Sequence, residues 1–242
     1  MRHETGCKPV YFDAQKMGEP EDNYVCWIDV MGTHNQMMRS LPTSANFIYK
    51  LHCAVLEAYE ALRLERDVGL YPVMDGLYVT SARRQPLSTL LGISMRHVAE
   101  TFLQESTNQH CFLVRGAIAF GPVYHGRTVH KEANWVLANH VQQRDSILLG
   151  LPMAQAYAAE SEAPPFGISI DASARAFAPS GDIPFRFIWW DWFSSVSPTL
   201  DRSAMLKKLD QYFAWQRQHT HTTGYKLDRI EYHSELAHEY FG

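Results

Sequence analysis

The sequence predicts an α+β sandwich, in which helices pack on a mostly antiparallel β-sheet. Segments typical of strands alternate with amphipathic helical segments along the chain. Two strand segments flank a tight turn, which disfavours an all-parallel, doubly wound sheet. The chain has 242 residues, of which 46% are hydrophobic and 20% charged, and this composition is typical of a globular protein rather than a disordered or fibrous one.

The first half of the chain predicts a polar leader followed by a βαββα pattern. Apolar residues spaced by three and four indicate the first helix, with Thr43 or Ser44 as its N-cap. Asp75-Gly76 between two β-branched, apolar segments is a strong hairpin signal. In order, we expect a leader over 1–22, a buried strand over 24–30, a helix over 44–66, hairpin strands over 68–74 and 76–80, and a helix over 87–106.

The second half adds strands and helices without an internal repeat. In order, we expect a strand over 111–124 that continues past Gly121-Pro122, a polar irregular stretch over 127–146, an Ala-rich helix over 150–160, strands over 166–171 and 185–193, a helix over 201–219, and a polar tail over 224–242. Residues 23–242 are expected to form one domain with a C-terminal extension. Its opening pattern is that of a ferredoxin-like βαββαβ core.

Charge and cysteine usage exclude several classes. There are 22 Lys and Arg against 26 Asp and Glu, a net charge of −4, so we expect no nucleic-acid partner. No apolar run approaches the roughly 18 residues of a membrane span, and residues 1–8 lack the apolar stretch of a signal peptide. The four cysteines are scattered, without a CxxC pair, and three lie in apolar surroundings. We therefore expect reduced thiols, a cytoplasmic location and no membrane partner.

Two aspartates are the first candidates for chemistry. Asp29 comes at the end of an apolar strand, and Asp75 lies at the tip of the predicted hairpin. A split βαβ sheet places the first strand beside the hairpin, so both carboxylates can meet at one sheet edge. Close carboxylates repel unless a cation or a proton intervenes, and hard oxygen ligands suit Mg²⁺ or Mn²⁺. The alternatives are an ordinary Asp-Gly turn for Asp75 and a helix N-cap for Asp29.

The turn after the first strand is a candidate phosphate site. The segment Val30-Met31-Gly32-Thr33 can offer successive backbone N–H groups to an anion. It lacks the Gly-Lys-Ser/Thr triplet of a Walker A loop, and the chain has no GxGxxG fingerprint.

From about residue 24 to 171, these pieces resemble the catalytic domain of class III nucleotidyl cyclases. Residues 27–33 look like the family's first metal motif, in which a strand ends in Asp and is followed by a Gly-containing turn. Residues 71–79 look like the hairpin that carries the second metal Asp, with Met74 where the family usually has Gly. Residues 114–126 are similar to the family's glycine-rich, Arg-containing strand, and this match is the most specific of the three.

The departures from the family concern recognition of the base and the ribose and stabilisation of the transition state. Aligning Gly150 puts Ala154 at the position of a ribose-orienting Asn and Ala158 at that of a transition-state Arg, and no Lys precedes Asp75 at the purine-reading position. In this respect the chain looks like the pyrimidine cyclases of bacterial Pycsar anti-phage systems. The resemblance implies a uridylate cyclase that converts UTP to 3′,5′-cyclic UMP and pyrophosphate. The alternatives are a cytidylate cyclase, a purine cyclase with unusual base readers, and a degenerate module that binds nucleotide without chemistry.

The resemblance also implies how the site works. Two Mn²⁺ or Mg²⁺ ions would be held by Asp29, Asp75 and the backbone carbonyl near Val30. Arg115, on an otherwise apolar strand, is expected to stabilise the departing pyrophosphate, and its alternative role is an ion pair with a helix carboxylate. Lys50 and Arg83 are weaker candidates for the same task.

Several other side chains have more than one predicted role. Tyr49 is a candidate to stack on the pyrimidine, against simple packing of its helix, whereas Phe47 and Ile48 are more typical of core. His219 and His221 lack a third ligand at a motif spacing, which argues against zinc. The aromatic cluster 189–193 is expected in the core or a dimer contact.

The resemblance implies a homodimer with active sites at the subunit interface. It also implies that a separate effector responds to the cyclic nucleotide product. The polar segments 127–149 and 224–242 are candidates for control of activity.

Overall fold

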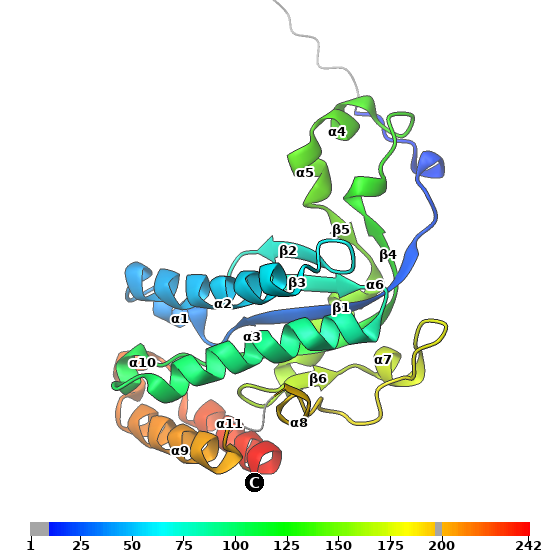
Figure 1. Ribbon diagram of the computed structural model, residues 1–242. Coiled ribbons are helices and arrows are strands. Elements are labelled where there is room, and N and C mark those ends of the chain that lie inside the picture. Colours follow the sequence, from blue (N-terminus) through cyan, green and yellow to red (C-terminus); the bar gives the residue numbers. More distant parts are fainter. Residues whose placement is uncertain (1–9, 197–199) are drawn as a thin grey trace, which may run out of the picture.

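A six-stranded sheet lies at the centre of the computed structural model, which describes residues 10–196 and 200–242 (Figure 1). The strands are β1 (Glu21–Val30), β2 (Gly69–Val73), β3 (Gly76–Ser81), β4 (Val114–His125), β5 (Leu148–Leu149) and β6 (Ile168–Ile170). Their order is β2-β3-β1-β4-β5, with all of these pairs antiparallel, and β6 runs parallel to β4. The mostly antiparallel sheet with packed helices confirms the predicted α+β class.

Two long helices, α2 (Leu41–Leu62) and α3 (Arg84–Gln104), pack against this sheet. Two more, α9 (Arg202–Gln218) and α11 (Leu227–Phe241), pack against each other, with α9 against α3 (Figure 1). Shorter elements complete the chain: α1 (Thr33–Met37), α4 (Trp135–Asn139), α5 (Val141–Asp145), α6 (Leu151–Ala159), α7 (Ala172–Ala176), α8 (Phe193–Val196), α10 (Thr220–Thr223) and the 3₁₀ turns η1 (Ala14–Lys16), η2 (Asn108–His110), η3 (Gly126–Thr128) and η4 (Glu160–Glu162).

The helix predicted over 44–66 begins earlier than the sequence pattern suggested. Ser40 is its N-cap, and the Ser40 Oγ accepts a hydrogen bond from the backbone N–H of Thr43. Pro42 lies in the first turn, where its missing N–H needs no partner. The predicted caps, Thr43 and Ser44, are therefore inside the helix.

The two faces of the sheet carry different layers. On β1, alternate residues such as Cys26 and Ile28 join the main core with Leu51 of α2 and Leu87 of α3. The other alternate residues, Val25 and Trp27, pack in a smaller cluster with Ala156 of α6. Long helices therefore cover one face and α6 the other.

Three segments differ from expectation. The tail over 224–242 is largely the helix α11, which buries Ile230, Leu236, Tyr240 and Phe241. The stretch 127–146 contains η3, α4 and α5 and forms a projecting arm (Figure 1). The aromatic run 185–193 forms no strand beyond one bridge between Ser169 and Trp189. Phe185, Trp190, Trp192 and Phe193 pack in the core instead, whereas Phe187 is exposed.

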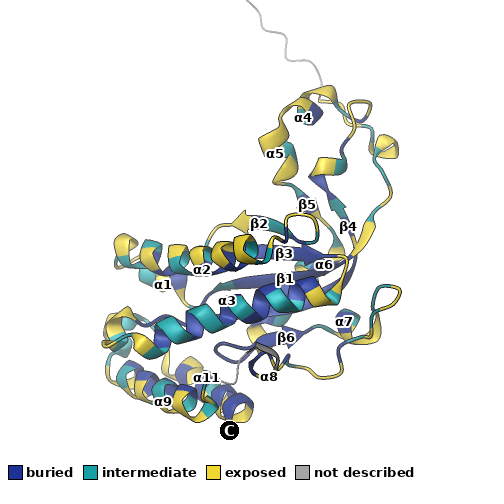
Figure 2. Ribbon diagram, viewed as in Figure 1, coloured by how far each residue is buried: buried dark blue, intermediate teal, exposed yellow. Residues whose placement is uncertain are grey.

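Burial differs between parts of the molecule, since β1 is largely buried whereas the arm with α4 and α5 is largely exposed (Figure 2). Cys26 and Cys111 are buried free thiols, as expected, but Cys53 is exposed on α2, and Cys7 lies outside the described residues. No helix within residues 10–196 and 200–242 is both long and apolar enough to cross a bilayer.

Candidate active site

Asp29 lies near the end of the central strand, between two antiparallel neighbours. It is opposite Gly76 of β3 on one side and Arg115 of β4 on the other. The alternation of β1 places Asp29 on the same face as Val25 and Trp27, which is the face that α6 covers. A Cβ added to Gly76 would stand 2.5 Å from the Ile28 carbonyl oxygen, so glycine lets β3 approach β1 this closely.

Asp75 lies in the two-residue loop of the β2–β3 hairpin, next to Gly76. Its loop neighbour Met74 adopts a left-handed backbone with φ of 54°. The Thr33 hydroxyl donates a hydrogen bond to the Asp75 carboxylate. This contact joins the hairpin tip to the turn after β1, where Gly32 has φ of 76°. The predicted meeting of the first strand's end with the hairpin tip is thus present.

The Asp29 carboxyl resists ionisation. Burial is the largest cause, and the negative charges of Glu160 and Asp75 add to it while Arg115 opposes them, so that the pKa of Asp29 is raised from 3.8 to about 8. Three carboxylates therefore share one electrostatic neighbourhood with a single guanidinium. Such an excess of negative charge is relieved by a proton or by a bound cation.

A divalent cation fits this donor set. The Asp29 Oδ1 is buried without a hydrogen-bond partner, so it has a lone pair free for a ligand. Carboxylate oxygens are the ligands that Mg²⁺ and Mn²⁺ prefer, and such ions commonly take one or two carboxylates with substrate phosphates and water. Among residues 10–196 and 200–242, no group of three or more His, Cys, Asp or Glu side chains is arranged as a metal site.

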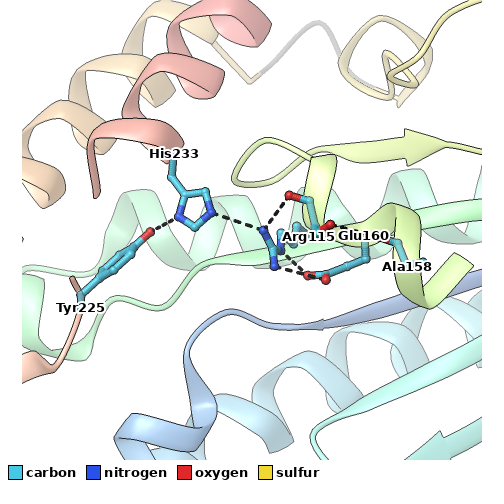
Figure 3. A network of polar contacts seen from close by, with 6 residues as sticks. Arg115, Ala158, Glu160, Tyr225 and His233 are labelled. Carbon is cyan, nitrogen blue, oxygen red and sulfur yellow. Dashed lines mark hydrogen bonds and ion pairs between the residues drawn. The ribbon is translucent and has the colours of Figure 1, made fainter. Parts of the chain in front are cut away.

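Arg115 is the hub of a polar network (Figure 3). Its Nε and Nη2 both donate to the Glu160 carboxylate, the second at 3.2 Å. Its Nη1 donates to the backbone carbonyl of Ser161 and to the His233 ring, each at 3.3 Å. The ion-pair alternative for Arg115 is therefore present, and direct contact with a pyrophosphate stays a prediction.

The C-terminal helix contributes His233 to this network. Burial first, then Arg115 and Arg229, lower the pKa of His233 from 6.5 to about 3, so its ring is neutral near pH 7. Because a guanidinium only donates, the His233 Nε2 must accept, and the ring proton belongs on Nδ1, which is hydrogen-bonded to the Tyr225 hydroxyl.

Other predicted residues lie further out. Val30 ends β1 with its side chain in the core. Tyr49 is 67% exposed on α2. Lys50 is half-buried near Cys111, whose raised pKa it partly offsets. Within the described residues neither Tyr49 nor Lys50 forms a hydrogen bond or ion pair with the carboxylates, and Arg83 pairs with Asp67 instead.

Three side chains of the network, Glu160, Tyr225 and His233, were not predicted. Glu160 is 8% exposed and follows α6. It is the only charged residue of the apolar segment 150–160, a signal that the sequence did contain. His233 was hidden because its segment appeared to be a polar tail.

Comparisons with solved structures return cyclase domains at low similarity. A double mutant of the guanylyl cyclase domain of the RhoGC fusion protein from the aquatic fungus Blastocladiella emersonii is 15% identical, with a TM-score of 0.47 over 65% of this chain and 83% of that chain. The guanylate cyclase domain of RhGC from Catenaria anguillulae, in complex with GTP, is 15% identical, with a TM-score of 0.47 over 64% and 81%.

A bacterial light-regulated adenylyl cyclase is 6% identical, with a TM-score of 0.43 over 65% of this chain and 45% of that chain. No protein-family model matches the chain, and no curated protein matches it.

Proposed function

We propose that the chain is a metal-dependent nucleotidyl cyclase that converts UTP to 3′,5′-cyclic UMP and pyrophosphate. The observation that carries the proposal is the position of Asp29, with a buried and unpaired Oδ1, beside the hairpin tip that bears Asp75. The motifs around these two residues are those that resemble class III cyclases.

In the proposed reaction the ribose 3′-oxygen attacks the α-phosphorus, and the bond from that phosphorus to the bridging oxygen of pyrophosphate breaks. The 3′-hydroxyl gives its proton to solvent water, and pyrophosphate leaves with the electron pair of the broken bond. Asp29, Asp75 and the Val30 carbonyl would hold two Mn²⁺ or Mg²⁺ ions, which when bound acidify the 3′-hydroxyl and neutralise phosphate charge. The turn Met31-Gly32-Thr33 would orient the triphosphate.

In this proposal Arg115 stabilises the departing pyrophosphate, as the resemblance implies, and it also positions the carboxylate cluster. Its hydrogen bonds to Glu160 hold a second carboxylate near Asp29, and its positive charge offsets part of the cluster's negative charge. Lys50 and Tyr49 lie on α2. In this proposal Lys50 contacts the phosphates and Tyr49 the base when α2 and the bound substrate approach each other.

A homodimer fits the exposed surface of α6. Ala154 and Ala158 are exposed, and so are Leu151 (67%) and Tyr157 (61%) on the same helix. In the class III cyclases that the chain resembles, the positions of Ala154 and Ala158 hold an Asn that orients the ribose and an Arg that stabilises the transition state. The active site of those cyclases lies at the subunit interface. We expect Leu151→Glu with Tyr157→Glu to give an inactive monomer in light scattering, and Leu56→Glu on α2, also exposed, to leave the dimer intact.

The pyrimidine preference rests on what the resembling segment lacks, namely the Lys of purine readers. The cyclic product would act on a separate effector protein in anti-phage defence. Cytidylate cyclase activity is the second candidate, since uracil and cytosine differ at one hydrogen-bonding edge.

The test is turnover of each of the four nucleoside triphosphates by the purified protein with Mn²⁺, with the products separated by chromatography and identified by mass spectrometry. Cyclic UMP and pyrophosphate are expected from UTP, and Asp29→Asn or Asp75→Asn should abolish both. Asp22→Asn, exposed near the other end of β1, is the matched control and should retain full activity. UTP binding without any product would instead identify a nucleotide-binding module, and cyclic CMP alone a cytidylate cyclase.

A further inference from the structure

Two segments that the catalytic proposal leaves unused are joined in the structure. The N-terminal segment around η1 runs alongside the arm that carries α4 and α5 (Figure 1). The Asp13 backbone N–H donates to the Ala133 carbonyl at 3.0 Å. The Asn134 side-chain amide donates to the Tyr11 carbonyl. These bonds connect residues more than a hundred positions apart in the chain.

The two segments share a cleft of about 660 Å³, here called the basic cleft, which is lined by the cations Lys16, Arg127, Lys131 and Arg144. Glu132 is the only carboxylate among its lining residues. Within the described residues, the side chains of Lys16, Arg127 and Lys131 form no ion pair and no hydrogen bond to protein. Arg144 pairs with the neighbouring Asp145.

The backbone fixes the spacing of these cations. A Cβ on Gly126 would stand 1.8 Å from the Arg144 carbonyl oxygen, so only glycine lets η3 lie this close to α5. The Gly126 N–H also donates to the Ile147 carbonyl at 2.8 Å. Arg127 and Arg144 consequently line the same cleft although they repel each other. In a chain of net charge −4, such a concentration of positive charge calls for an anion.

The basic cleft is separate from the candidate active site. Arg115 and His125 lie near opposite ends of β4, and ten residues of strand span roughly 33 Å. The arm begins directly after His125 with Gly126. A ligand in the cleft is therefore remote from Asp29 of the same chain.

We infer that the basic cleft binds a small, multiply phosphorylated anion. Its volume suits a ligand of nucleotide size. Arg and Lys are the side chains that recognise phosphate oxygens, through paired hydrogen bonds and charge. Among the described residues that line the cleft there is no Phe, Tyr or Trp, and the His130 imidazole is the one ring beside four cations, so recognition rests on the phosphates.

The test is calorimetric titration with inorganic tripolyphosphate in the presence of EDTA, which removes the divalent ions on which binding at the aspartates depends. Arg127→Ala with Lys131→Ala should weaken binding at least about tenfold, the scale of one lost charge-assisted hydrogen bond. The matched control is Arg66→Ala with Lys207→Ala, which removes the same charges from exposed positions elsewhere and should bind like wild type. Uridine, which lacks phosphate, should not bind.

Three outcomes would overturn the inference. One is no binding of tripolyphosphate, or equal weakening in both double variants. Another is binding that disappears in Asp29→Asn but survives in the cleft variant, which would place the anion at the candidate active site. The third is binding of a single-stranded oligonucleotide without binding of tripolyphosphate, which would indicate a nucleic-acid surface. None of these measurements depends on whether the chain is a cyclase.

Discussion

Arg115 and Glu160, 45 positions apart in sequence, form a two-point ion pair at the centre of the site, with the Arg115 Nε and Nη2 both donating to one carboxylate. The side chains are only 16% and 10% exposed. Removing one partner of a buried pair leaves an uncompensated charge, which is more costly than removing both.

We therefore expect Arg115→Met to lower the free energy of unfolding by roughly 3 kcal/mol, and Arg115→Met with Glu160→Gln to lose less. Urea unfolding at neutral pH measures both. Arg83→Met, which breaks the more exposed pair with Asp67, is the control and should lose under about 1 kcal/mol. Equal losses of unfolding free energy for Arg83→Met and Arg115→Met would show that burial does not strengthen the Arg115–Glu160 pair.

The raised pKa of Asp29 predicts a pH-dependent stability. Above pH 3.8 the unfolded chain loses this proton, whereas the folded chain keeps it until about pH 8. The folded state binds more protons in this window, so stability falls as pH rises through it. The slope should be absent in Asp29→Asn and present in Asp22→Asn, as measured by thermal unfolding in EDTA.

Bound Mn²⁺ should compete with the proton on the Asp29 carboxyl. Mn²⁺ needs the ionised carboxylate, so its stabilisation of the wild type should be larger at about pH 8.5 than at about pH 6. Asp29→Asn should show no Mn²⁺-dependent shift of the melting temperature. A shift of wild-type size in that variant would contradict a metal role for Asp29.

His233 predicts a change of the opposite sign in an overlapping pH range. Its pKa is about 3 in the folded chain and 6.5 when unfolded, so the unfolded chain binds the extra proton as pH falls below 6.5. Stability should drop by about 2 kcal/mol between pH 7 and about pH 5 through this group alone. His233→Gln should lose that part of the drop in urea unfolding.

His221→Gln, at an exposed position on α10, is the control for His233 and should follow the wild type. Parallel pH curves for the wild type and His233→Gln would mean that the ring is already accessible to protons in the folded chain.

Gly76 links stability to the proposed chemistry. An added methyl group would meet the Ile28 carbonyl oxygen at 2.5 Å and the Asp29 Cβ at 2.7 Å, so β1 and β3 must separate. Gly76→Ala should cost about 2 kcal/mol and reduce cyclase turnover at least about tenfold. Gly18→Ala, with no atom within 4 Å of its added Cβ, should change neither quantity. Full activity in Gly76→Ala would show that the spacing of the two strands is not critical.

Tyr49 separates base stacking from helix packing. The side chain is 67% exposed, so Tyr49→Ala should change the unfolding free energy by less than about 0.5 kcal/mol. If the ring stacks on uracil, KM for UTP should rise roughly tenfold with little change in stability. Phe177→Ala, which removes a ring that is 64% exposed elsewhere, should leave KM unchanged. An unchanged KM in Tyr49→Ala would remove this residue from the site.

The pairing of Asp29 with the hairpin was predictable because it follows from local signals. An apolar strand, a helix and a hairpin in that order have few arrangements, and each puts the strand's end near Asp75. The partner of Arg115 was not predictable, because no local pattern says which distant carboxylate meets a given strand residue. The sequence could only state the ion pair as one of two roles.

The C-terminal helix was missed for a physical reason. Ile230, Ala237 and Phe241 have helical spacing, but the stripe also buries His233 and Ser234, which are polar. A buried helix face that contains polar residues has the same sequence pattern as a solvent-exposed face. The strand predicted over 185–193 was wrong for a different reason. Aromatic residues are typical of strands, but they also pack into a core from a loop.

The place of β1 between β3 and β4 has a consequence for biosynthesis. Both of its hydrogen-bonding neighbours are made later, the first over 76–81 and the second over 114–125. While the nascent chain leaves the ribosome, the apolar stretch from Tyr24 to Ile28 therefore waits without a pairing strand on either edge. This stretch gains its second pairing edge only after residues 116–120 of β4, which lie opposite it, have emerged.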